Sequence, residues 1–191
     1  MVDLGNPYSI KQGLEEMRKR LDGGPLHALI NNAGVSPKGQ DGARLGAVDT
    51  DLDLWRHVFQ VDFFAPIMLA RGLVEELKRG NASIVNVTSI AGSRVHPFAG
   101  AAYATSKSAL AALTREMSAD FGPLGIRVNA IAPGEIDTAI VSPGTEKLAN
   151  TLPLRRLGNP AEVADTIYFL CSKRSSYVSG AEIHIDGGEH I

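Results

Sequence analysis

The sequence lacks several features that would assign it to common classes of protein. It has one cysteine, Cys171, among 191 residues, so an internal disulfide is excluded, and no Cys/His cluster has the spacing of metal ligands. No apolar run reaches the ~18 residues that a membrane span needs, and no basic segment followed by an apolar one opens the chain. We therefore expect no metal, no membrane association and a cytoplasmic location.

Aromatic residues and an excess of one charge are also scarce. Phe, Trp and Tyr make up 6% of the chain, and 19 basic residues stand against 21 acidic ones. Since Lys and Arg form no basic block, we expect no nucleic-acid partner. A hydrophobic content of 44%, without repeats or linkers, predicts a single folded domain over residues 1–191.

Short apolar runs alternate with longer segments of helical period, as in parallel sheets with crossover helices. Strands are predicted within residues 27–34, 82–92, 126–134 and 179–188. Helices are predicted over 11–24, with Ser9 a candidate N-cap, from Thr50 to Lys78, over 101–122, and from Asn159, which precedes Pro160 and Glu162. The pattern predicts an α/β fold with a Rossmann-like doubly wound parallel sheet.

Ligands of such sheets bind beyond the carboxyl ends of the strands. Residues 31–34, 88–89 and 133–134 all lie at these ends. Three separate regions of the sequence should therefore meet at one rim, which is the candidate site.

Tyr103 and Lys107 are four residues apart in a helical segment, so their side chains share a face. A nearby ammonium favours the phenolate and lowers the pKa of a tyrosine, which makes the pair a candidate general acid/base. An isolated pair of this kind is more often an ordinary helix surface. Ser89, at the end of the preceding strand, strengthens the case because its hydroxyl could bind a substrate oxygen near the tyrosine.

Together these residues resemble the classical short-chain dehydrogenase/reductase (SDR) family. The resemblance covers essentially the whole chain, in the family's order and approximate spacing, and rests on NNAG at 31–34, Ser89, YATSK at 103–107, RVNAIAPG ending at 134, Thr138 and the closing SGAEIHIDGG. It implies reversible hydride transfer between NAD or NADP and a small or medium alcohol or ketone. It also implies a homodimer or homotetramer, because the helices that hold Asp62 and Tyr103 resemble those that pair subunits.

The resemblance also implies a role for each matching residue. Tyr103 would exchange the hydroxyl proton, Lys107 would lower the tyrosine pKa and hold the nicotinamide ribose, and Ser89 would fix the substrate oxygen. The implied cofactor-binding residues are Asp3, Leu4, Asn31, Ala33, Gly34, Tyr103, Lys107, Pro133, Gly134, Ile136 and Thr138. We expect the loop residues Arg94, His96 and Phe98 to border the substrate, together with a lid over residues 135–157.

Asp62 departs from the family pattern, which has a catalytic asparagine at this place. The main-chain role of that residue would survive the change. Two alternatives stay open for the side chain. A carboxylate near Lys107 would offset the pull of the ammonium and raise the pKa of Tyr103, whereas a carboxylate pointing into water would change little.

The N-terminus departs as well, because the chain has no glycine-rich phosphate turn near its start. Relative to the family, roughly 60 residues are absent, about two strand-helix units. The strand at 27–34 should then be an exposed apolar edge. A start assigned too late, a natural short form that pairs with another copy, and a decayed fragment are the open explanations. A non-catalytic SDR-like scaffold is accordingly the alternative to an enzyme.

Overall fold

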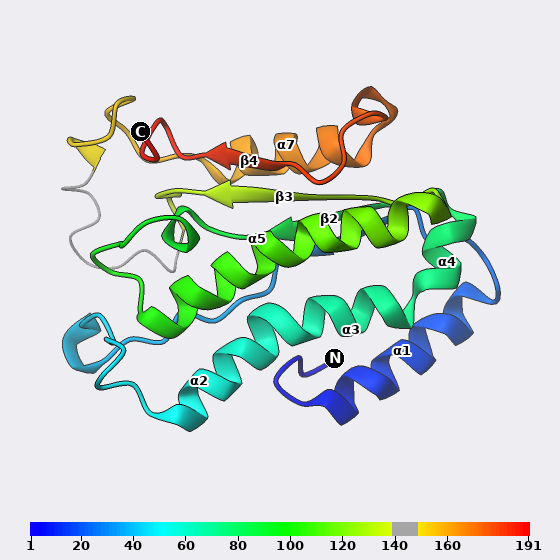
Figure 1. Cartoon of the computed structure of the whole chain (residues 1–191), viewed down its shortest axis with the longest axis horizontal. Helices are drawn as coiled ribbons and strands as arrows, with labels where there is room; N and C mark the ends of the chain where they lie inside the picture. The colour runs from blue at the N-terminus through cyan, green and yellow to red at the C-terminus, as the bar shows by residue number, and fades with distance from the viewer. Residues whose placement is uncertain (139–148) are drawn as a thin grey trace.

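Four parallel strands form the sheet in a computed structural model that describes residues 1–138 and 149–191. Their order in space is their order in the chain: β1 (Ala28–Asn31), β2 (Ser83–Val87), β3 (Arg127–Pro133) and β4 (Glu182–Ile185). Each strand pairs in parallel with the next, and the arrowheads of β3 and β4 point to the same side in Figure 1. The predicted Rossmann-like parallel sheet is confirmed.

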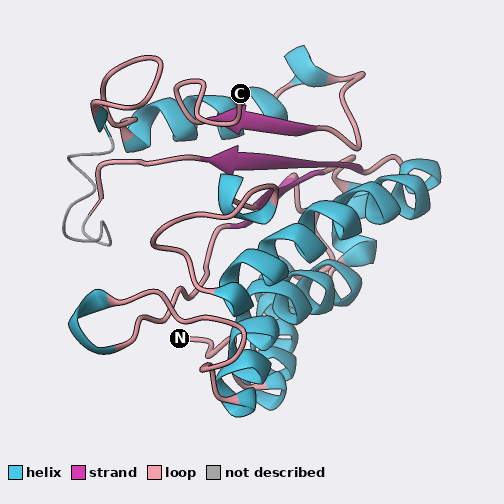
Figure 2. Cartoon of the chain, turned by 60° about the vertical axis from the view of Figure 1, so that its left-hand side comes forward, coloured by secondary structure: helices cyan, strands magenta, loops and turns pink. Residues whose placement is uncertain are grey.

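Helices cover both faces of the sheet, as a doubly wound fold requires. They are α1 (Pro7–Leu21), α2 (Leu52–Phe59), α3 (Ala65–Gly72), α4 (Val74–Arg79), α5 (Ala101–Phe121) and α7 (Pro160–Cys171). Figure 2 shows the larger helical layer on one side of the strands and α7 on the other. None of the helices in the described ranges combines the length and apolarity needed to cross a membrane.

The alternation of side chains along the strands divides the core into two. Ile84 and Val128 are fully buried against the larger helical layer, in a cluster with Leu77 of α4. Val85 and Ile131 lie on the opposite face of the sheet, where they pack with residues of α7. Because successive strand residues point to opposite faces, both faces of the central strands must be apolar.

The prediction of one continuous helix from Thr50 to Lys78 is wrong. A π-helical turn, η2 (Gln60–Phe64), separates α2 from α3, and a further break separates α3 from α4. Pro66 has no amide hydrogen to donate to the carbonyl of Asp62, four residues earlier, so the α-helical ladder cannot continue through it. The sequence contained this signal in Pro66.

Two of the three predicted helix caps are also wrong. The first helix is capped by Asn6, whose side chain accepts from the Tyr8 amide at 3.0 Å, while Ser9 lies inside the helix. Asp51, not Thr50, caps α2 and accepts from the Asp53 amide at 2.7 Å. The backbones of Asn6 and Asp51 are non-helical, with ψ angles of 109° and 141°. An N-cap residue requires such a backbone. The cap at Asn159 is confirmed, with a complete capping box to Glu162.

β1 is an edge strand that pairs only with β2 within the described residues. Ile30 on this strand is 41% exposed, which confirms the predicted exposed apolar edge. Residues 139–148, in the middle of the predicted lid, lie outside the described residues.

Candidate active site

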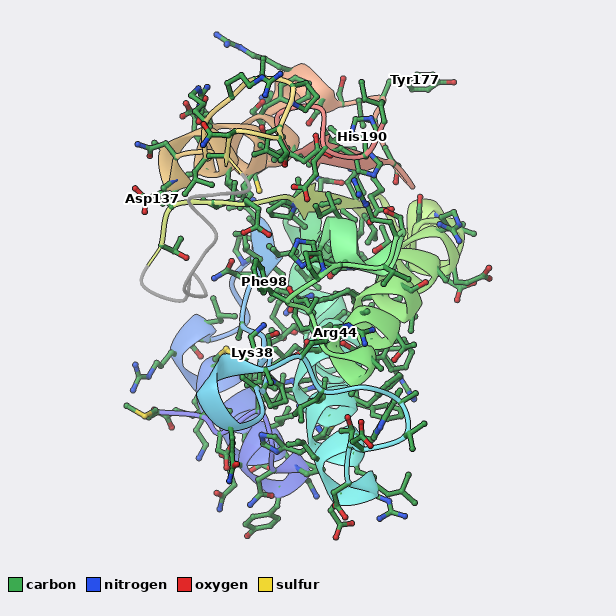
Figure 3. The ribbon with its side chains drawn as sticks, turned by 90° about the vertical axis from the view of Figure 1, so that its left-hand side faces the viewer. Lys38, Arg44, Phe98, Asp137, Tyr177 and His190 are labelled. Atoms are coloured by element: carbon green, nitrogen blue, oxygen red, sulfur yellow. The ribbon has the colours of Figure 1, made fainter. Side chains whose placement is uncertain are left out.

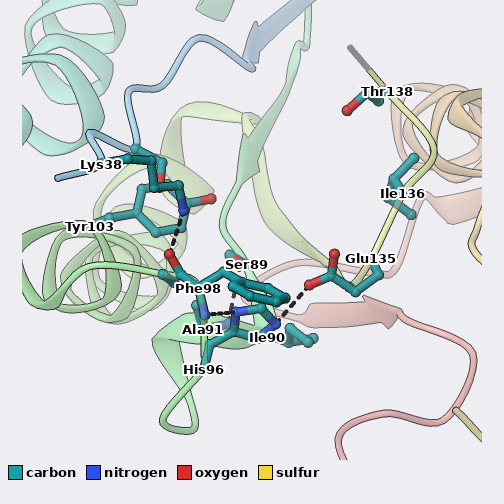
Figure 4. Close-up of a pocket in the computed structure, with 13 residues that line it drawn as sticks. Lys38, Ser89, Ile90, Ala91, His96, Phe98, Tyr103, Glu135, Ile136 and Thr138 are labelled. Carbon is teal, nitrogen blue, oxygen red and sulfur yellow. Dashed lines mark hydrogen bonds and ion pairs between the residues drawn. The ribbon is translucent and has the colours of Figure 1, made fainter. Parts of the chain in front are cut away.

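The predicted rim exists, and a cavity of about 250 Å³ opens beyond the strand ends. Its lining includes five residues predicted for catalysis or cofactor binding: Ser89, Tyr103, Gly134, Ile136 and Thr138. His96 and Phe98, predicted to border the substrate, line it as well (Figure 4). Segments that follow β2 and β3 and the start of α5 thus meet in one hollow.

Ser89 and Tyr103 bring two hydroxyl groups to this cavity. Ser89 directly precedes the short helix η3 (Ile90–Gly92) and its side chain accepts from the Ala91 amide at 3.2 Å. Tyr103 lies in the first turn of α5. Burial raises the pKa of Tyr103 to about 12, hydrogen bonding with Ser89 opposes this, and the carboxylates of Asp62 and Glu135 raise it further.

Lys107 is not among the groups that shift the pKa of Tyr103 in this structure, and its predicted effect on the tyrosine stays a prediction. The Lys107 Nζ atom lies 5.6 Å from the centroid of the Tyr103 ring and donates to the Val87 carbonyl at 3.0 Å. Its nearest carboxylate is Asp62, at 3.8 Å. The ammonium is directed toward these oxygens, and burial therefore determines the pKa of the phenol.

Asp62 is fully buried and faces Lys107, which decides between the two alternatives for its side chain. Its Oδ1 accepts from the Val35 amide at 2.8 Å, and the Ser106 hydroxyl lies 3.2 Å from Oδ2. Burial raises the pKa of Asp62, while Lys107 lowers it. Burial lowers the pKa of Lys107, and Asp62 raises it. The predicted effect of Asp62, a raised pKa of Tyr103, is confirmed.

Four of the predicted cofactor-binding residues line a second, open hollow next to Lys107: Asp3, Leu4, Ala33 and Gly34. Gly34 is required there by close approach, because a Cβ atom on it would lie 3.0 Å from Lys107 Nζ. The absence of a side chain at Gly34 leaves room for the Lys107 ammonium beside the hollow. Cofactor contact at these residues stays a prediction.

Two of the other predicted cofactor residues, Asn31 and Gly134, have structural partners. Asn31 donates to the Asn86 side chain at 2.8 Å and so braces β1 against β2. Gly134 follows Pro133 at the end of β3, and its amide donates to the Ile185 carbonyl at 3.1 Å. A Cβ atom on Gly134 would lie 2.7 Å from that of Asp186, so only glycine fits. These contacts position the rim, and cofactor contact at these residues stays a prediction.

One predicted substrate residue lies elsewhere. Arg94 is outside the lining of the cavity and donates to the main-chain carbonyl of Glu189. Two charged residues line the cavity instead: Lys38, which sequence reasoning missed, and Glu135, the first residue of the predicted lid. Lys38 donates to the Phe98 carbonyl, and the two residues lie close together in Figure 3.

Known proteins share both the sequence and the arrangement. The family model described as enoyl-(acyl carrier protein) reductase matches residues 1–190. An oxidoreductase (short chain dehydrogenase/reductase) from Brucella ovis has 61% sequence identity and a TM-score of 0.83, over 96% of this chain and 80% of that one. The chain belongs to the SDR family. The resemblance stated from the motifs is confirmed.

Other relatives extend the comparison. Protein FixR of Bradyrhizobium diazoefficiens is 58% identical over all of this chain, which spans 69% of FixR. The Brucella ovis oxidoreductase has also been solved with a partially ordered NAD. A 3-oxoacyl-[acyl-carrier protein] reductase from Brucella melitensis with bound NAD has 32% identity and a TM-score of 0.88, over 99% of this chain and 70% of that one. NAD, which is bound in these two structures, is one of the two cofactors expected from the sequence.

Proposed function

We propose that the cavity is the active site of an NAD- or NADP-dependent oxidoreductase that interconverts an alcohol with a ketone or aldehyde. The observation that carries the proposal is the position of the Ser89 and Tyr103 hydroxyls on one cavity, with Lys107 buried one turn below the tyrosine. This is the arrangement that acid/base catalysis at a substrate oxygen needs. The nicotinamide, when bound, supplies or accepts the hydride.

In the direction of reduction, Tyr103 donates its phenolic proton to the carbonyl oxygen as the hydride reaches the carbonyl carbon. In oxidation, the phenolate takes the proton from the substrate hydroxyl. Ser89 holds the same oxygen by a hydrogen bond in both directions. Because the pKa of Tyr103 is about 12, the phenol is protonated at neutral pH and can act as the donor in reduction, but it is a weak acid and donates its proton less readily than a tyrosine with a pKa near neutrality.

Lys107 and Gly34 are the residues we assign to the ribose end of the cofactor. The Lys107 side chain is 3% exposed, and a Cβ atom on Gly34, which lines the hollow, would lie 3.0 Å from its Nζ atom. Asp3 and Leu4, at the far side of that hollow, are assigned to the adenine. Gly134, Ile136 and Thr138, which line the cavity, are assigned to the carboxamide.

The buried Asp62–Lys107 pair supports a second candidate function, a non-catalytic scaffold. Asp62 holds the ammonium and helps to keep the Tyr103 pKa high, and both effects oppose catalysis at neutral pH. A protein that keeps the Ser89 and Tyr103 hydroxyls but binds no dinucleotide would function only by binding partners at its surface.

Cofactor binding separates the two functions. The 191-residue protein is titrated with NADH and with NADPH while nicotinamide fluorescence is followed. Saturable micromolar binding supports the enzyme. A folded protein, shown by circular dichroism, that binds neither nucleotide supports the scaffold.

Substitution of Tyr103 then tests its role. We expect Tyr103→Phe to abolish carbonyl reduction and to leave NADH binding within about twofold, because the phenyl ring keeps the packing. Tyr168→Phe is the matched control, since Tyr168 is 76% exposed on α7. Activity that persists in Tyr103→Phe would refute the assignment.

A further inference from the structure

One titratable cluster at the wall of the cavity contains no residue that is assigned to hydride transfer. His96, Glu135 and Glu189 come from three distant segments: the loop before α5, the end of β3 and the C-terminal residues. One ligand-type atom from each lies within 4.8 Å of the others. The side chains are 7%, 15% and 11% exposed in that order, so the cluster is largely withdrawn from water.

The cluster contains two polar atoms without hydrogen-bond partners. Within residues 1–138 and 149–191, His96 Nε2 and Glu189 Oε2 are the buried side-chain atoms in this condition. His96 Nε2 lies 2.7 Å from Glu135 Oε1 and 3.7 Å from Glu189 Oε1. A contact of 2.7 Å that is not a hydrogen bond means that the oxygen lies off the direction of an N–H. Buried polar atoms of this kind call for a bound ion or water.

The charges in the cluster point to a cation. Two carboxylates face a single imidazole, and the nearby Arg94 donates to the Glu189 main-chain carbonyl, which leaves the carboxylate without that partner. Lys38 is likewise engaged by the Phe98 carbonyl. Arg94 acts on Glu189 and Lys38 acts on Glu135 through their charges, but no ion pair joins either cation to these carboxylates within the described residues. In a site shielded from water, two adjacent carboxylates are costly, and a positive ion between them lowers that cost.

We propose that His96, Glu135 and Glu189 form a binding site for a divalent transition-metal ion. One imidazole nitrogen and two carboxylate oxygens suit first-row ions such as Zn²⁺, Mn²⁺ or Co²⁺. The ion accepts the lone pair of His96 Nε2 and binds Glu189 Oε2, so it satisfies both unpartnered atoms. Three protein ligands leave at least one coordination position for water or for an oxygen of a ligand in the cavity.

Binding has a consequence for the His96 ring. The Phe98 amide donates to His96 Nδ1 at 3.3 Å, so the neutral ring now carries its proton on Nε2. Coordination through Nε2 moves that proton to Nδ1 and releases this long hydrogen bond. We therefore expect the Phe98 amide resonance to shift on metal addition in a ¹⁵N NMR spectrum.

A bound ion would link three segments that are distant in the sequence. His96 and Glu135 line the cavity, and Glu189 joins them from the C-terminal residues behind it. The proposal does not rest on the hydride-transfer function, because metal binding is measured without cofactor or substrate.

The test is calorimetric titration of the 191-residue protein with Zn²⁺, supported by visible absorption after addition of Co²⁺. We expect one ion per chain. His96→Gln and Glu189→Gln should each weaken binding by roughly tenfold or more. Circular dichroism verifies that both variants fold, and Glu135→Gln provides a third variant if either one does not.

His190→Ala is the matched control, because His190 lies next to Glu189 but pairs with Asp186 at 2.7 Å and stacks on His184. Its binding should equal that of the unchanged protein. No heat of binding, or binding that His190→Ala removes while His96→Gln and Glu189→Gln keep it, would overturn the proposal. The second result would place the ion at the exposed histidine pair.

Discussion

At the scale of single residues, the site is governed by burial more than by pairing. Tyr103 and Lys107 have the spacing expected of an acid/base pair, yet the ammonium is turned toward Asp62 and Val87. The phenol consequently keeps a high pKa, about 12. The sequence placed these groups within reach of each other, whereas side-chain packing decided which of them meet.

Asp62→Asn tests the electrostatic role of the buried carboxylate. An amide oxygen can still accept from the Val35 amide, but the negative charge that raises the Tyr103 pKa is removed. The pKa of Tyr103 should therefore fall. Alcohol oxidation needs the phenolate, so we expect the alkaline rise of kcat/KM for oxidation to move to lower pH.

The measurement is the pH profile of kcat/KM for both proteins. Asp53→Asn is the control, because Asp53 is an exposed carboxylate in α2, and its profile should match that of the unchanged protein. An identical profile for Asp62→Asn would contradict the electrostatic role.

Gly34→Ala tests the close approach of the backbone to Lys107. The added Cβ atom would lie 3.0 Å from Nζ, and the flexible lysine end can give way without unfolding the protein. We expect NADH affinity to fall roughly tenfold, about 1.4 kcal/mol, with little change in Tm. Gly122→Ala is the matched control, since nothing lies within 4 Å of its added Cβ. Unchanged affinity in Gly34→Ala would separate Lys107 from the cofactor.

At the scale of elements, local sequence patterns located the strands and helices. The N-termini of two helices were misplaced because neighbouring residues can serve equally well as N-caps. Asn6 and Asp51 act as caps in place of Ser9 and Thr50, because a shift of one to three residues exchanges one good cap for another. The π-helical turn before Pro66 is the larger difference. Asp62 lies in this turn and is fully buried, beside Lys107 and Ser106, where a regular helical register was expected.

Asn159→Ala tests the strongest cap in the described ranges, the capping box of α7. The substitution removes the acceptor for the Ala161 amide at 2.9 Å and leaves the start of the helix uncapped. We expect a loss of about 1 kcal/mol in the free energy of unfolding by urea denaturation. Asp165→Asn, an exposed change on the same helix, should stay within about 0.5 kcal/mol. A loss no larger than that of this control would mean that α7 does not depend on its cap.

At the scale of the whole molecule, apolar side chains remain on the surface. Phe64, in the turn that carries Asp62, is 47% exposed, and Ile30 on the edge strand is 41% exposed. Exposed apolar surface favours association of copies. Single exposed side chains are common on monomers, so the homodimer or homotetramer stays a prediction from the family resemblance.

Light scattering measures the assembly. We expect a mass at least twice that of the 20.3 kDa chain. Phe64→Glu should shift the population toward the monomer if the helices that hold Asp62 and Tyr103 pair the copies, because a carboxylate would be buried at the contact. Tyr177→Glu, at a fully exposed position, is the control. A monomeric mass for the unchanged protein would refute the prediction.

The sequence by itself determined the parallel α/β sheet, the rim at the strand ends, the SDR family and the Ser89–Tyr103 pair. These features follow from periodicity and from motifs, which can be recognised in the sequence without knowing which distant residues are in contact. The tertiary structure alone decided the direction in which Lys107 turns, the burial of Asp62 and the meeting of His96 with Glu135 and Glu189. Spacing along the chain predicted no metal ligands, because those three residues are brought together only by folding. Which charges become neighbours, and how much water reaches them, depends on long-range packing.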